Sequence, residues 1–245
     1  MSGRYYKIND RDYVSVTTII KDVLNAPQLT AWRVREGIKT ALEQVKVNPD
    51  ITMEEVLQIE KDKLNKTGER GMSVHTLIAN AKSQKIDIKT VMTPEYVGYI
   101  ECYNKWIDDI KPLPPILTEK EVHHPDFYYA GTLDGVYPIE IGAIATDFDK
   151  GITKPLTVNI LVDIKTGFVN DITGTQLTFY EYALAQNLPE LDIYEKRILK
   201  LSKDGSYDRD ENWIKTEESF KFCKYMLALW RRYYASKKFN RQWVN

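Results

Sequence analysis

The sequence has little cysteine, almost no net charge and no long apolar run, and each of these features excludes a class of protein. Among its 245 residues, only Cys102 and Cys223 are cysteines. Two thiols cannot supply the four ligands of a structural zinc site or an iron–sulphur cluster. We therefore expect two reduced thiols and no iron–sulphur cluster.

The charge balance and the apolar segments exclude further classes of protein. The formal net charge is −1, so any contact with nucleic acid has to rest on local basic patches rather than on the field of the whole molecule. No apolar run approaches the roughly 20 residues that span a bilayer. The first ten residues, MSGRYYKIND, also lack the apolar core of a signal peptide. We expect a cytoplasmic protein without membrane contact.

The first 115 residues have mainly helical patterns. The β-branched segment from Tyr13 to Ile20 fits either a strand or an extended entry into a helix through Leu24. Four further helices are expected, beginning near Pro27, Met53, Gly71 and Tyr96. In the helix that begins at Pro27, one face at helical spacing is apolar and is made by Val34, Ile38, Ala41, Leu42 and Val45.

Residues 116–245 have the patterns of a sheet with flanking helices. Strands are expected over Glu119 to His123, Tyr128 to Ile139, Leu156 to Ile164, Ile193 to Leu201 and Asn212 to Thr216. Helices are expected from Gln176 to Gln186 and from Glu217 onward. The stretch from Glu140 to Pro155 fits a loop or a hairpin extension. The sequence thus predicts one α/β domain over residues 1–245, with a helical N-terminal third (1–115) and a sheet core (116–245).

One strand end combines an acidic and a basic residue after an apolar run. In Leu161-Val162-Asp163-Ile164-Lys165-Thr166-Gly167, Asp163 and Lys165 are two apart and therefore share a face of the strand. Burying both charges would cost several kcal/mol without a compensating partner, such as a metal ion. The alternative is an exposed strand end with an ordinary ion pair.

A second carboxylate lies in another apolar segment. Asp134 follows Gly131-Thr132-Leu133 and precedes Gly135. It fits either the interior of a strand or an Asp-Gly hairpin turn. If Asp134 and Asp163 lie on neighbouring strands, their oxygens suit a hard divalent cation. A lysine beside them can stabilise an oxyanion or help to deprotonate water, and this combination suits phosphodiester hydrolysis.

The order and spacing of four motifs add a resemblance. Gly71-x-x-x-His75, Gly131-Thr132-x-Asp134, Asp163-x-Lys165 and Gln176-x-x-x-Tyr180 resemble, in this order, the RecB-like branch of the PD-(D/E)XK nuclease superfamily. Ser15-Val16-Thr17-Thr18-Ile19 with Pro27 and Trp32 is similar to phage-encoded and mitochondrial-type exonucleases of this branch. The resemblance implies a restriction-endonuclease-like core, with a central mixed β-sheet flanked by helices.

The resemblance also implies residue roles. Asp134, Asp163, His75 and the Ile164 backbone carbonyl would bind Mg²⁺ or Mn²⁺, and Lys165 would be the catalytic lysine. Gln176 and Tyr180 would position the substrate strand and that lysine. Glu121 and Thr166 are weaker candidates for the site.

The expected function is a DNA exonuclease in phage-type recombination, replication or repair. Its partner would be DNA, with a single-strand annealing or binding protein as a further candidate. A flap endonuclease and a non-catalytic DNA-binding protein are the alternatives.

The helix from Phe220 onward carries interleaved basic and aromatic residues, which fit either a nucleic-acid surface or an ordinary solvated basic face.

Overall fold

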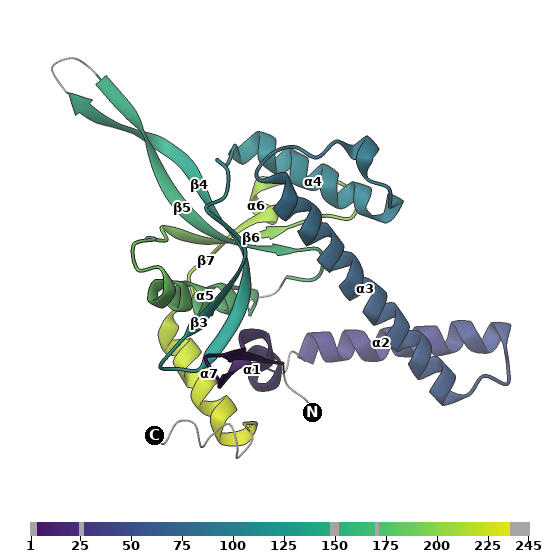
Figure 1. Ribbon diagram of the computed structural model, residues 1–245. Helices are drawn as coiled ribbons and strands as arrows, with labels where there is room; N and C mark the ends of the chain where they lie inside the picture. The colour runs from purple at the N-terminus through teal and green to yellow at the C-terminus, as the bar shows by residue number, and fades with distance from the viewer. Residues whose placement is uncertain (1–3, 25–26, 148–151, 170–171, 236–245) are drawn as a thin grey trace.

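The computed structural model describes residues 4–24, 27–147, 152–169 and 172–235, and its centre is a mixed seven-stranded sheet (Figure 1). The strand order is β1-β2-β4-β5-β6-β7, and β3 also pairs with β4. The β2–β4 and β5–β6 pairs are parallel, and the other pairs are antiparallel. The strands are β1 (Tyr5–Ile8), β2 (Arg11–Ser15), β3 (Leu117–His124), β4 (Tyr129–Asp147), β5 (Ile152–Lys165), β6 (Glu195–Lys200) and β7 (Trp213–Thr216).

Helices cover both faces of this sheet. They are α1 (Val16–Val23), α2 (Pro27–Val47), α3 (Met53–Ala81), the short 3-10 helix η1 (Ile88–Thr90), α4 (Pro94–Ile110), α5 (Thr173–Asn187), α6 (Arg209–Asn212) and α7 (Phe220–Tyr233). Leu161 of β5 packs in one core cluster with residues of α1, α5 and α7. Its neighbour Val162 packs in a second cluster with residues of α3 and α4. Because successive strand residues point to opposite faces, the mixed α/β architecture with a helix-flanked central sheet is confirmed.

The N-terminal segment combines the two structures that its sequence allowed. Residues Arg11–Ser15 form β2, and Val16 begins α1. The preceding strand β1, which the sequence analysis missed, forms a hairpin with β2. Its turn has Asn9 and Asp10 at positive φ (49° and 61°). Asn and Asp tolerate this conformation and favour tight two-residue hairpin turns.

Helix α3 is continuous, so the prediction of a separate helix beginning near Gly71 is wrong. The helix begins after a capping box, in which the side chains of Thr52 and Glu55 bond each other's backbone amides. Gly71 lies within it, where a glycine costs about 1 kcal/mol relative to alanine. Burial of Val74 and Ile78 in the second core cluster offsets that cost.

The helix predicted from the apolar spacing of α2 is present, but its apolar face is not buried. Val34, Ile38, Leu42 and Val45 are 47–61% exposed. The side of α2 that contacts α3 carries Thr40 instead, which is buried and hydrogen-bonded to Glu60. Helix α2 and the N-terminal part of α3 form an arm that extends from the sheet (Figure 1), so the apolar residues of α2 make no contact with the core.

The stretch from Glu140 to Pro155 is a hairpin extension rather than a loop. Strands β4 and β5 stay paired as far as Asp147 and Ile152, with register shifts at Glu140/Gly142 and Ala145/Asp147. This hairpin projects from the sheet (Figure 1). Within the described ranges, no helix combines the length and the apolar character needed to cross a membrane.

Candidate active site

The candidate site lies where β4 and β5 separate. Their ladder ends at the pair Gly135–Val162, and Asp134 and Asp163 are the next residues on the two strands. Asp134 lies in the interior of β4, which pairs with β3 on its other side. The hairpin-turn interpretation of Asp134-Gly135 is therefore wrong, and the two carboxylates lie on neighbouring strands.

On the α3 side, three residues form a group that we call the open trio: His75, Glu119 and Asp134. One potential ligand atom from each lies within 4.8 Å of the others. His75 Nδ1 is 3.3 Å from Asp134 Oδ1, and these two side chains are 22% and 12% exposed. Burial lowers the pKa of His75, but the hydrogen bond and charge of Asp134 outweigh this effect and raise it. Burial also raises the pKa of Glu119, and Asp134 adds to the rise.

The acidic residue from β3 in this trio is Glu119 and not Glu121. Thr118 pairs with Gly135 and Lys120 with Leu133, so Glu119 falls opposite Asp134. Glu121 pairs with Thr132 and is not part of the trio. Glu119 has φ 46°, a left-handed conformation that is uncommon for a residue other than glycine and can mark a functional site.

On the α5 side, Asp163 and Lys165 form a close pair, which we call the strand pair. Lys165 Nζ lies 2.6 Å from Asp163 Oδ2, and the two side chains are 27% and 2% exposed. Asp163 Oδ1 is buried and has no hydrogen-bond partner among the described residues. Burial raises the pKa of Asp163 to about 6, although Lys165 opposes the rise. The alternative of an exposed strand end is therefore wrong.

The lysine of the strand pair is hydrogen-bonded to a short chain of polar side chains on α5. Lys165 Nζ donates to Gln176 Oε1 at 3.5 Å, and Gln176 Nε2 donates to the Tyr180 hydroxyl at 2.9 Å. Burial lowers the pKa of Lys165, but Asp163 and Asp134 outweigh this effect, so the net shift is upward. Burial and Asp163 raise the pKa of Tyr180, so its hydroxyl stays protonated.

Two glycines of the motifs allow helices to approach the strands. A Cβ atom on Gly131 would lie 2.3 Å from Cε1 of Tyr180, so only glycine leaves room for this ring against β4. A Cβ atom on Gly71 would lie 3.2 Å from Oγ1 of Thr166. Gly71 thus brings α3, which carries His75, close to the end of β5.

The backbone of Ile164 faces the open trio. Its N–H donates to Asp134 Oδ2 at 2.5 Å. The carbonyl of the next residue, Lys165, accepts from the Leu201 N–H beyond β6. Because the N–H and C=O of one strand residue point to the same edge, the Ile164 carbonyl is also directed toward β4 and Asp134.

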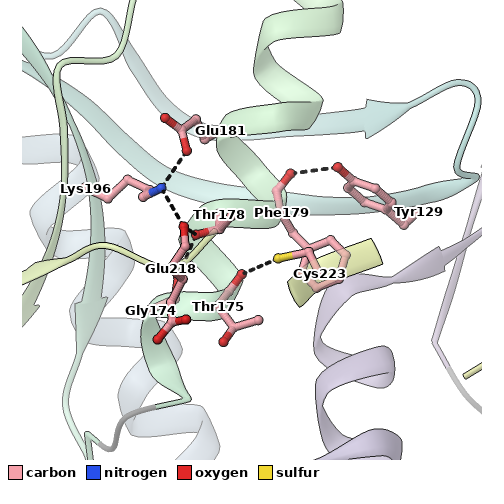
Figure 2. A network of polar contacts seen from close by, with 9 residues as sticks. All are labelled: Tyr129, Gly174, Thr175, Thr178, Phe179, Glu181, Lys196, Glu218 and Cys223. Carbon is pink, nitrogen blue, oxygen red and sulfur yellow. Dashed lines mark hydrogen bonds and ion pairs between the residues drawn. The ribbon is translucent and has the colours of Figure 1, made fainter. Parts of the chain in front are cut away.

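Helix α5 is fixed in place by a polar network that the sequence analysis did not anticipate (Figure 2). The Tyr129 hydroxyl donates to the Phe179 carbonyl at 3.1 Å. Thr178 Oγ1 donates to the Glu218 carbonyl at 3.1 Å, and the Cys223 thiol lies 3.9 Å from the Thr175 carbonyl oxygen. These contacts hold α5 between β4 and the start of α7, and so set the position of Gln176 and Tyr180.

The remaining sequence expectations concern residues away from the candidate site. Cys102 and Cys223 are free and buried. The side chain of Trp32 and the basic and aromatic residues after position 235 lie outside the described residues.

No protein-family model matches the chain, and no curated protein matches its sequence. The functional proposal therefore rests on the arrangement of the open trio and the strand pair.

Proposed function

We propose that the chain is a metal-dependent deoxyribonuclease with a restriction-endonuclease-like core, of the RecB-like PD-(D/E)XK type, and that it acts on DNA ends. One observation carries this proposal. A buried carboxylate, Asp163, is paired with Lys165 on one side and has a second oxygen without a hydrogen-bond partner among the described residues. A carboxylate–histidine group with converging ligand atoms lies at the neighbouring position of β4.

The residues present fit a hard divalent cation. A buried charged oxygen without a partner is costly, and a cation bound between Asp163 and the open trio would remove that cost. The ligands would be carboxylate oxygens of Asp134, Asp163 and Glu119, the Ile164 carbonyl, and one imidazole nitrogen of His75. Oxygen ligands with a single imidazole suit Mg²⁺ or Mn²⁺. When bound, such an ion polarises a phosphate and lowers the pKa of a coordinated water.

Lys165 supplies the charge of the site that does not depend on a metal. Because its pKa is raised, it stays an ammonium group, which can stabilise negative charge on a phosphate oxygen or donate a proton to a leaving oxygen. Gln176 accepts a hydrogen bond from this ammonium, and the Tyr180 hydroxyl accepts one from Gln176. These two side chains therefore orient the lysine.

The preference for DNA ends rests on the resemblance of the ordered motifs. The test is incubation of the purified protein with end-labelled linear DNA and covalently closed circular DNA, in Mg²⁺, in Mn²⁺ and in EDTA. We expect linear DNA to shorten progressively, closed circles to survive, and EDTA to stop the reaction without unfolding the protein. Rapid nicking of closed circles would favour the flap endonuclease alternative. Intact linear DNA in both metals would contradict nuclease activity.

A further inference from the structure

Helix α7 has a buried face and an outer face of distinct composition. Cys223, Met226, Leu227 and Trp230 are buried. The outer face carries the exposed cations Lys221, Lys224 and Arg232, together with the exposed apolar and aromatic residues Phe222, Tyr225, Leu229 and Tyr233. No acidic residue occurs between Phe220 and Tyr233. In a chain with a net charge of −1, this helix is a local basic surface.

Lys221 lies 6.0 Å from the centroid of the Tyr225 ring and Lys224 5.8 Å from that of Phe220, and all three outer cations remain exposed. None of them forms an ion pair with a described acidic residue. Of the acidic residues beside α7, Asp22 accepts from the Trp230 indole, Glu181 pairs with Lys196 and Glu217 with Lys215, while Glu218 directly precedes the helix. Arg231, by contrast, donates to the Phe127 carbonyl.

The aromatic residues distinguish this face from an ordinary solvated basic helix. Tyr225 and Tyr233 are 59% and 73% exposed, although nothing in solubility requires exposed rings on a charged face. They lie eight residues apart, about 12 Å along the helix axis and about 80° apart around it, and Lys221 and Arg232 lie within about 40° of Tyr225. Exposed rings among cations suit single-stranded nucleic acid, whose bases stack on the rings while its phosphates contact the cations.

Helix α7 also lies close to the candidate active site. Helix α5 contacts α7 through Thr175 and Cys223 (Figure 2). The same helix carries Gln176 and Tyr180, which extend toward Lys165. The start of α7 therefore packs against the helix that orients Lys165, and its exposed outer face lies on the side away from α5.

We propose that the outer face of α7 binds single-stranded DNA, with Lys221, Lys224 and Arg232 on the phosphates and Tyr225 and Tyr233 stacked on bases. This surface would hold the strand outside the active site, and it deepens the proposed nuclease function, on which it rests. The expected substrate class is DNA with an unpaired segment that reaches beyond the cleaved nucleotide.

The test measures binding in EDTA, so that cleavage plays no part. A fluorescein-labelled oligothymidylate is titrated with wild-type protein and with the variant Lys221→Gln/Lys224→Gln/Arg232→Gln over a range of salt concentrations. Each phosphate contact on a single strand adds roughly 0.7 to the slope of log affinity against log salt, so we expect the slope to fall by about 2. The matched control, Lys82→Gln/Lys89→Gln/Lys203→Gln, removes the same charge from exposed positions away from α7 and should bind as wild type does.

A second variant tests the rings independently of charge. Tyr225→Ala/Tyr233→Ala should weaken binding roughly fivefold or more for each ring that stacks on a base, with an unchanged salt slope. Melting curves establish that the variants are folded, which their exposed positions favour.

The outcomes separate the inference from the proposed function. If the charge variant and its control bind single strands equally, the inference is overturned even if the wild type cleaves DNA. If the charge variant loses binding while the wild type never cleaves DNA, the inference stands and the nuclease proposal fails. A charge variant that loses binding to anionic phosphatidylglycerol vesicles, yet binds DNA normally, would also overturn it and assign the face to a membrane surface.

Discussion

The open trio and the strand pair meet where β4 and β5 separate, but their charges are compensated in different ways. In the trio, three ligand atoms converge from α3, β3 and β4, and Asp134 raises the pKa of the imidazole against the effect of burial. In the strand pair, a carboxylate with almost no solvent contact relies on one lysine, which α5 in turn orients. The trio thus offers ligands to a metal ion, whereas Lys165 of the strand pair supplies a positive charge that does not depend on one. This difference suggests that metal binding and charge stabilisation can be separated by mutation.

The largest effect is expected from a substitution in the open trio. Asp134→Asn keeps the shape of the side chain but removes the charge shared by His75, the Ile164 amide and the proposed ion. We expect calorimetric binding of Mn²⁺ to be lost and cleavage to fall by about 10³-fold, the scale for losing a major electrostatic contribution. The control is Asp126→Asn, at an exposed carboxylate between β3 and β4. Undiminished Mn²⁺ binding by Asp134→Asn would remove the trio from the metal site.

The next effect concerns the packing that joins the two groups. Gly131→Ala forces a Cβ atom against the Tyr180 ring, and overpacking of this kind costs about 1–3 kcal/mol. Denaturant unfolding should show this loss, and the loss should shrink in a Tyr180→Ala background, where the ring is absent. Equal losses in both backgrounds would show that the Gly131–Tyr180 contact is not the cause.

A smaller effect distinguishes two acidic residues on one strand. Glu119→Gln removes a proposed charged ligand and should weaken Mn²⁺ binding at least about tenfold, the lower end of the loss for outer-shell groups of a metal site, and His75→Ala should act in the same direction. Glu121→Gln is the matched control and should leave Mn²⁺ affinity unchanged, because Glu121 faces Thr132 in the register. The reverse pattern would show that the β3 register is different in solution.

The smallest effect tests the polar chain on α5. Tyr180→Phe removes only the hydroxyl that accepts from Gln176. A single hydrogen bond contributes about 0.5–1.5 kcal/mol, so the cleavage rate should fall about two- to tenfold while Mn²⁺ affinity stays the same. A fall in Mn²⁺ affinity instead would mean that the strand pair and the trio are not separable through α5.

The difference between Glu119 and Glu121 shows what the sequence could and could not specify. Strand alternation places both residues on one face of β3, so only the register with β4 decides which of them meets Asp134. Register depends on the pairing of segments far apart in the chain. The spacing of Asp163 and Lys165, by contrast, is local, and alternation alone predicts their shared face.

Helix α2 also shows that local sequence does not specify contacts between distant segments. Its apolar spacing predicts a helix, and the helix is present. Periodicity cannot say which neighbour the apolar face meets, and the structure directs it away from α3. The continuous α3 differs for another reason, since a glycine signals a helix boundary only when burial further along does not offset its cost.

The most direct measurement of the division between the two groups is the cleavage rate of Lys165→Ala. The variant is mixed with end-labelled linear DNA at a Mn²⁺ concentration that calorimetry has shown to fill its site. We predict that it binds Mn²⁺ as tightly as wild type or more tightly, since a neighbouring positive charge is gone. Its single-turnover rate should be at least about 10²-fold lower, the scale for losing a proton-transferring or charge-stabilising group. Cleavage at the wild-type rate by Lys165→Ala would contradict the role of the strand pair.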